Sequence, residues 1–196
     1  MHCRLASTLA GSVGATPLRA VAVAVISALC GACLAGTARA DELSDITRSF
    51  RAGQTAEAFN SLERLQAARP KDPAVRFLKG VLLADAQRNA EAVLTFQRLV
   101  EDFPELPEPY NNLAVLYAAA GDDDKARTSL EAALRANPGY TVAQQNLGDV
   151  YTRLASRAYE RVLQREPANA WAAARLSLLR DANALQPGIP APKSAP

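Results

Sequence analysis

Two residue types recur along this chain at one fixed interval. Prolines stand at Pro70, Pro104 and Pro138, and an alanine precedes each of them by 12 residues, at Ala58, Ala92 and Ala126. Because the two series share an interval of about 34 residues and keep the same phase, the chain is predicted to repeat one supersecondary unit. Apolar residues at helical spacing fill these units, and no strands are expected, so the fold class is predicted to be all-α.

The stretch 107–138 shows what one unit is expected to be. Its sequence, PEPYNNLAVLYAAAGDDDKARTSLEAALRANP, predicts two short amphipathic helices that fold back on each other at Gly121. The first carries Tyr110, Leu113, Ala114 and Tyr117, the second carries Ala126, Leu130 and Ala133, and a proline closes the unit. This order resembles the signature of the tetratricopeptide repeat family, with Tyr, Ala and Leu in place of Trp, Gly and Phe.

The resemblance implies a right-handed solenoid of stacked antiparallel helix pairs. The units are placed at 41–70, 73–104, 107–138 and 141–167, followed by a capping helix at 168–185 and a disordered tail at 186–196. In the capping helix, Trp171, Leu176 and Leu179 are expected to face inward. Trp171 is expected to pack against the preceding helix, with stacking on a ligand as the alternative.

The unit 141–167 departs from the pattern. Gly148 precedes its alanine, Ala155, by 7 residues, whereas Gly80 precedes Ala92 by 12, so the residues of the turn are missing. Apolar residues continue at helical spacing through this place, and no Gly, Pro, Asn or Asp lies between Asp149 and Glu166. We therefore predict one continuous helix from about Thr141 to Arg165, with a shortened hairpin as the alternative.

The first forty residues are predicted to be a signal peptide. Arg4 and Arg19 precede an uncharged apolar run at 20–36, and Ala38-Arg39-Ala40 supplies a cleavage site before Asp41. A lipoprotein modified at Cys33 and an uncleaved membrane anchor remain alternatives. The chain is therefore expected to be exported, to the periplasm of a bacterial envelope.

The leader contains all three cysteines, the single histidine and the single methionine of the chain. The remaining chain lacks the side chains for disulfides, for zinc sites of the usual kind and for Cys-His or Ser-His nucleophiles. No enzyme activity, metal or cofactor is expected. The stretch Asp122 to Asp124 lacks the ligand spacing of a calcium loop and is interpreted as a helix cap.

The charge of the chain after the leader is close to neutral. Three of the 22 basic residues lie in the leader, which leaves 19 against 20 acidic residues. A balance of this kind argues against nucleic acid or an anionic membrane as the main partner. Another protein, of unknown identity, is the expected partner.

In the family that the sequence resembles, the first helix of each pair lines a concave groove that binds a segment of another protein. The corresponding positions here are Phe77, Val81, Asp85, Asn111, Asn112, Val115, Gln145, Asn146, Asp149 and Thr152. Asp149 is expected either to contact the partner or to form a salt bridge with Arg153 one turn later. The carboxylate clamp of heat-shock co-chaperones is rejected, because Phe77, Val81 and Val142 replace its basic or amide groups.

These observations predict a non-enzymatic adaptor of the cell envelope that binds a partner protein in its groove. One alternative is a structural subunit, a homodimer formed through the long helix at 141–165. The other is a cell-wall hydrolase, which the absence of His and Cys disfavours. The sequence does not name the partner, because one scaffold of this kind serves many ligands.

Overall fold

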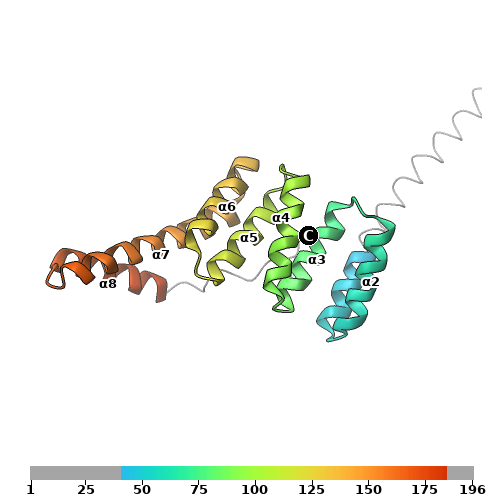
Figure 1. Cartoon of the computed structure of the whole chain (residues 1–196), viewed down its shortest axis with the longest axis horizontal. Coiled ribbons are helices and arrows are strands. Elements are labelled where there is room, and N and C mark those ends of the chain that lie inside the picture. Colours follow the sequence, from blue (N-terminus) through green and yellow to red (C-terminus); the bar gives the residue numbers. More distant parts are fainter. Residues whose placement is uncertain (1–40, 185–196) are drawn as a thin grey trace, which may run out of the picture. The chain divides into compact units, whose positions relative to one another are not determined.

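The computed structural model describes residues 41–184, and in this part of the chain helices follow one another with short turns between them (Figure 1). Their bounds are α2 Thr55–Ala68, α3 Pro73–Asp85, α4 Asn89–Asp102, α5 Pro107–Ala119, α6 Asp123–Ala136, α7 Thr141–Arg165 and α8 Ala170–Ala184. Residues 41–51 are also helical, and the chain divides into two units between Asp45 and Ile46. The predicted signal peptide and tail lie outside the described residues.

The helices pack in pairs, α3 with α4, α5 with α6 and α7 with α8, and the first helices of successive pairs also contact each other. Residues 41–184 contain no strand. This arrangement is an all-α solenoid of stacked helix pairs, which confirms the predicted fold class.

The repeat period is visible in the turns and caps. Gly53, Gln87 and Gly121, which lie one repeat apart, all adopt positive φ angles of 83°, 61° and 80°. Glycine reaches this region without strain, whereas Gln87 does so at a cost. The Asp122 side chain accepts a hydrogen bond from the Lys125 backbone N–H at 3.1 Å, which confirms that the acidic stretch caps α6.

The hydrophobic core lies where the second helix of each pair crosses the first helices next to it. The three alanines that mark the period are fully buried, as close helix crossing requires. Phe96 is also fully buried, and its ring lies against Gly80, where a side chain would meet the ring at 2.5 Å. Burying each Phe or Leu of this core contributes about 1.5–3 kcal/mol relative to exposing it.

α7 is one continuous helix of 25 residues from Thr141 to Arg165, as predicted. Its first half packs on α6 and its second half on α8. No atom lies within 4 Å of a Cβ built on Gly148, because the second helix that would cover this glycine has been absorbed into α7.

The expected salt bridge between Asp149 and Arg153 is wrong. The Arg153 Nε donates instead to Asp123 at 2.8 Å, and Arg157 donates to the other oxygen of the same carboxylate at 2.8 Å and to the Gly121 carbonyl at 3.1 Å. The Asp123 side chain is buried, and a buried carboxylate needs its charge compensated more than a half-exposed one does. These contacts fix α7 to the turn before α6.

The expected orientation of α8 is partly wrong. Leu176 is buried and Leu179 half-buried, as predicted, but Trp171 is 61% exposed. Ala172 takes the inward position in its place, which rotates the tryptophan away from the buried face. The Tyr159 ring of α7 still packs against Trp171 in a T-shaped arrangement with centroids 5.5 Å apart, so the predicted contact of the tryptophan with the long helix is present.

Candidate protein-binding groove

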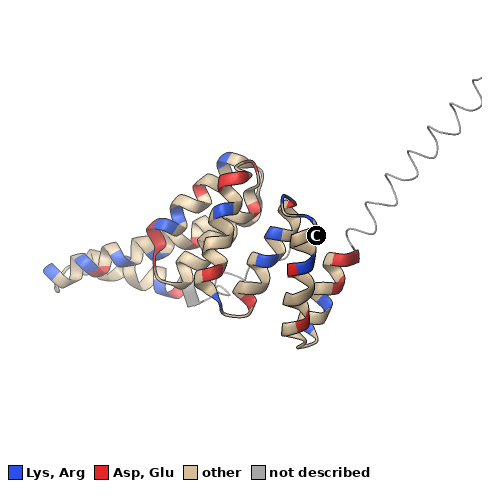
Figure 2. Cartoon of the chain, turned by 45° about the vertical axis from the view of Figure 1, so that its right-hand side comes forward, with Lys and Arg blue, Asp and Glu red and all other residues tan. Residues whose placement is uncertain are grey.

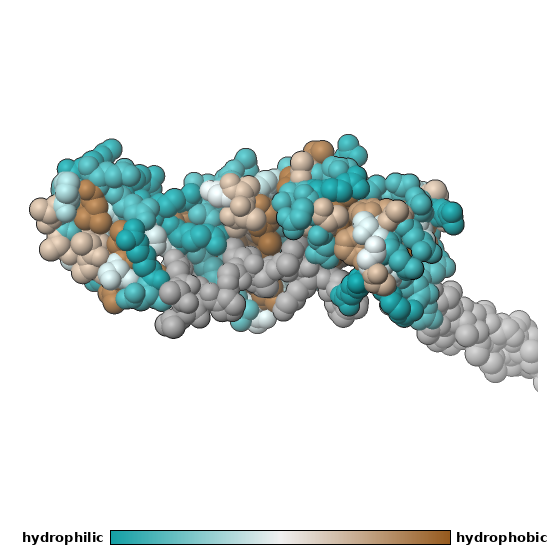
Figure 3. Space-filling model, turned by 90° about the horizontal axis from the view of Figure 1, so that it is seen from below, coloured by the Kyte–Doolittle hydropathy of each residue, from teal (hydrophilic) through white to brown (hydrophobic). Residues whose placement is uncertain are grey.

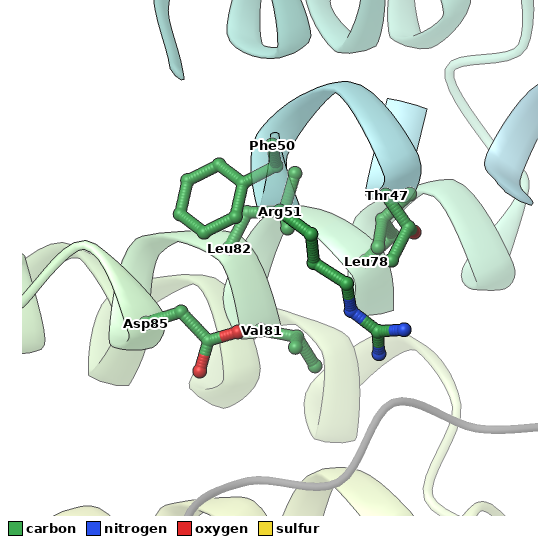
Figure 4. A pocket seen from close by; sticks show the side chains of 7 residues that line it. All are labelled: Thr47, Phe50, Arg51, Leu78, Val81, Leu82 and Asp85. Carbon is green, nitrogen blue, oxygen red and sulfur yellow. The ribbon is translucent and has the colours of Figure 1, made fainter. Parts of the chain in front are cut away.

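A small pocket of about 50 Å³ opens between the first described helix and α3. Figure 4 shows the side chains that line it: Thr47, Phe50, Arg51, Leu78, Val81, Leu82 and Asp85. Phe50, Leu78, Val81 and Leu82 supply apolar side chains to the lining, and Figure 4 shows Arg51 and Asp85 on either side of Val81. The pocket has room for one small apolar group, with a cation and an anion beside it.

The carboxyl group of Asp85 is placed where ionisation is unfavourable. Desolvation by its neighbours raises the pKa of Asp85, and the positive charge of Arg51 opposes this shift only in part. The residue is also the last of α3, and the negative end of a helix dipole disfavours an anion there. A carboxylate held against two unfavourable effects is a candidate for a binding role.

Arg51 was not among the residues predicted for the groove. A signal for it exists in the sequence, because Arg51 precedes Asp85 by one repeat. Residues one repeat apart on first helices lie side by side in a solenoid. Applying the period backwards from Asp85 would therefore have found its oppositely charged neighbour.

The structure divides the ten predicted groove residues into two groups. Asp85 and Gln145 are exposed, and Asp149 and Thr152 are partly exposed. The other six are buried: Phe77, Val81, Asn111, Asn112, Val115 and Asn146. The accessible part of the predicted groove is thus polar, and the buried part holds the first helices together.

The buried residues have identifiable packing partners. Phe77 and Val81 belong to the same core cluster as Phe96, and the Phe77 and Phe96 ring centroids are 5.7 Å apart. The Asn146 amide donates to the Asn111 side-chain oxygen at 2.8 Å and so links α7 to α5. In a dry environment, such a bond stabilises and also positions the two helices.

Asn112 occupies the same repeat position as Asn146, but its amide nitrogen has no hydrogen-bond partner within residues 41–184. The difference follows from the neighbouring helix. Position 77, one repeat before Asn111, is a phenylalanine and offers no oxygen. The link between first helices is therefore made from α7 to α5 and is not repeated from α5 to α3.

This asymmetry predicts different costs for two neighbouring substitutions. Asn111→Ala leaves the Asn146 amide buried and unpaired, and should lower the free energy of unfolding by about 1–3 kcal/mol. Asn112→Leu removes an amide nitrogen that is already unpaired and should cost less or be neutral. Urea denaturation followed by circular dichroism measures both. Equal losses would show that Asn112 has a partner.

The pKa of Asp85 should respond to its neighbour. Arg51→Ala removes the charge that lowers this pKa, so the pKa should rise further above its ordinary value. Carboxyl-detected NMR titration of the parent and the variant measures it. A lower or unchanged pKa in the variant would show that the guanidinium does not act on this carboxyl.

The raised pKa of Asp85 also makes the stability of the folded protein depend on pH in a defined direction. A raised pKa means that the folded protein holds this proton to a higher pH than the unfolded chain does. The contribution of the Asp85 carboxyl to the free energy of unfolding is therefore present at low pH. It is lost as the pH rises through the pKa that this carboxyl has in the folded protein. Asp85→Asn cannot ionise, so this variant should not show that loss in pH-dependent urea denaturation.

No group of His, Cys, Asp and Glu within 41–184 could hold a metal ion. Over the same residues, no helix combines the length and apolar character needed to cross a bilayer. Figure 2 shows basic and acidic residues interspersed along the helices.

Comparison with known proteins agrees with the fold and the repeat. Two models described as tetratricopeptide repeat match residues 48–107 and 107–140. Residues 48–140 of this chain are therefore tetratricopeptide repeats. A curated relative, the tetratricopeptide repeat domain-containing protein PYG7 of Arabidopsis thaliana chloroplasts, is 38% identical over 98 residues. The match covers 47% of this chain and about a third (33%) of that protein.

Solved structures show the same fold at low sequence identity. Two crystal structures of MamA match with TM-scores of 0.51 and 0.52 and identities of 20% and 19%. They cover 70% and 74% of this chain and 84% and 81% of those chains. A structure of Naa15/Naa10 bound to HypK-THB matches with a TM-score of 0.50 and 16% identity, over 74% of this chain and 23% of that one.

Proposed function

We propose that this chain is a non-enzymatic adaptor of the bacterial cell envelope. It binds a segment of another protein on the surface formed by the first helices of its helix pairs. The pocket between Arg51 and Asp85 carries the proposal. Its apolar lining residues can contact one small side chain, and the two opposite charges beside it can pair with the backbone or charges of an extended segment. Family and fold are those of protein-interaction modules.

The exported location is part of the proposal and rests on the leader. Its test is direct. The mature protein should appear in the periplasmic fraction, and its mass should correspond to a chain that begins at Asp41. A mass that includes the cysteines of the leader would contradict export with cleavage at this site.

Crosslinking in cells tests the binding surface. A photo-reactive residue at position 145 or 152, both in the accessible part of the predicted groove, should trap the same protein. Leu94, which is 54% exposed on the second helix α4, serves as the control and should not trap it. Combining position 145 with Arg51→Ala should reduce the yield. Trapping from Leu94 alone would place the binding surface elsewhere.

A further inference from the structure

The last described helix, α8, is apolar on two faces. Ala172 and Leu176 face the interior, but Trp171 and Leu178 are 61% and 63% exposed. With exposed Ala174 between them, they follow the i, i+3, i+7 spacing of one helix face. We call Trp171, Ala174 and Leu178 the outer stripe. Figure 3 shows hydrophobic and hydrophilic residues side by side where α7 and α8 lie.

The two ends of the outer stripe differ in charge. The Arg175 guanidinium lies over the Trp171 ring, 5.6 Å from its centroid, so the N-terminal end of the stripe carries a cation. Asp181 follows Leu178 by three residues and is exposed, so the C-terminal end carries an anion. Large and small side chains also alternate along the stripe.

An α8 from a second copy, lying antiparallel on this stripe, would match both its opposite charges and its alternation of large and small side chains. Reversing the direction places Asp181 of the second copy opposite Trp171 and the guanidinium above it. It also places Ala174 of each copy opposite Leu178 of the other. The cation and the anion then pair twice, once on each side of a two-fold axis.

We infer that this chain self-associates through the outer stripe, with α8 of two copies packed antiparallel. The occupant of the exposed face is thus a second copy of this chain. An anionic lipid surface suits the stripe less well, because Asp181 lies on the face that would enter the headgroup region. The contact buries few large side chains and belongs to the small class of interfaces.

The chain itself contains the probe for this contact. Trp171 is the only tryptophan of the chain, so intrinsic emission under tryptophan-selective excitation reports on the stripe alone. The purified protein should form a dimer in sedimentation velocity as its concentration rises, and the emission should shift to the blue over the same range. A protein that stays monomeric at all accessible concentrations overturns the inference.

Charge reversal tests the antiparallel arrangement itself. Arg175→Asp and Asp181→Arg each place like charges opposite one another and should weaken the dimer by more than about tenfold. The double variant Arg175→Asp/Asp181→Arg restores opposite pairs and should recover the dimer. Failure of the double variant to recover it, although it remains folded by circular dichroism, contradicts the antiparallel pairing.

Two further measurements exclude other occupants. Leu178→Asp should abolish the dimer, whereas Leu94→Asp, which charges a comparably exposed leucine on α4, should leave it intact. Equal loss in both variants overturns the assignment to α8. Vesicles of phosphatidylglycerol and phosphatidylcholine should leave the emission of the monomer unchanged. A blue shift caused by vesicles at a concentration without dimer would assign the stripe to a membrane.

Discussion

Replacing Gly80 with alanine is expected to destabilise the protein by about 1–3 kcal/mol, the range for overpacking a filled core. The new methyl group would stand 2.5 Å from the Phe96 ring, and that ring is fully buried between α3 and its neighbours. Neither the helix nor the ring can move without disturbing the core around them. Urea denaturation or a thermal melt of the purified variant measures the loss.

Gly148 offers a matched control two repeats later. The same substitution there meets no atom within 4 Å, and an alanine in a helix is favoured over glycine by about 0.5–1 kcal/mol. Gly148→Ala should therefore raise stability while Gly80→Ala lowers it. Equal destabilisation by both would show that a second helix covers Gly148 and that α7 is not continuous.

Thr152→Pro is expected to destabilise the protein by about 3 kcal/mol or more. Residue 152 lies inside the continuous helix α7, where proline removes an intrahelical hydrogen bond and clashes with the preceding turn. The second half of α7 carries α8, so helical content should fall and the Trp171 environment should change. Circular dichroism and the emission of the single tryptophan follow both effects.

Two controls separate the backbone effect from others. Thr152→Ala removes only the hydroxyl that donates to the Gly148 carbonyl at 2.9 Å, and should cost little. Thr141→Pro introduces proline at the first residue of α7, where α3 and α5 already have Pro73 and Pro107, and should be tolerated. If Thr152→Pro matches Thr152→Ala, a turn is present there and the hairpin alternative holds.

The repeat period accounts for most of what the sequence could predict. It locates the turns so firmly that Gln87 adopts the left-handed conformation of Gly53 and Gly121 without being a glycine. The loss of residues between Gly148 and Ala155 predicted α7 with its observed ends. Both follow from local rules, namely turn position and uninterrupted helical spacing.

Features that depend on packing against other helices could not be read from the sequence. Phe77 and Val115 occupy groove positions by their place in the repeat, but neighbouring helices bury them. Arg153 has an acid within helical reach at Asp149, yet it pairs with a buried carboxylate 30 residues away. Ala172 is buried where Trp171 was expected to be, because the buried face of α8 is displaced by one residue along the sequence. Helical periodicity alone does not distinguish these two orientations of the helix.

The fusion of two helices into α7 also limits how this array can be lengthened. A new helix pair added after Arg165 would find no second helix of ordinary length to stack on, and α8 already occupies the side of α7 that such a pair would need. Extra units should be inserted before Thr141. Duplicates of residues 107–140 would there pack against helices of the same kind as those that α5 and α6 contact in this protein. An engineered series of longer arrays should therefore keep α7 and α8 as its closing pair.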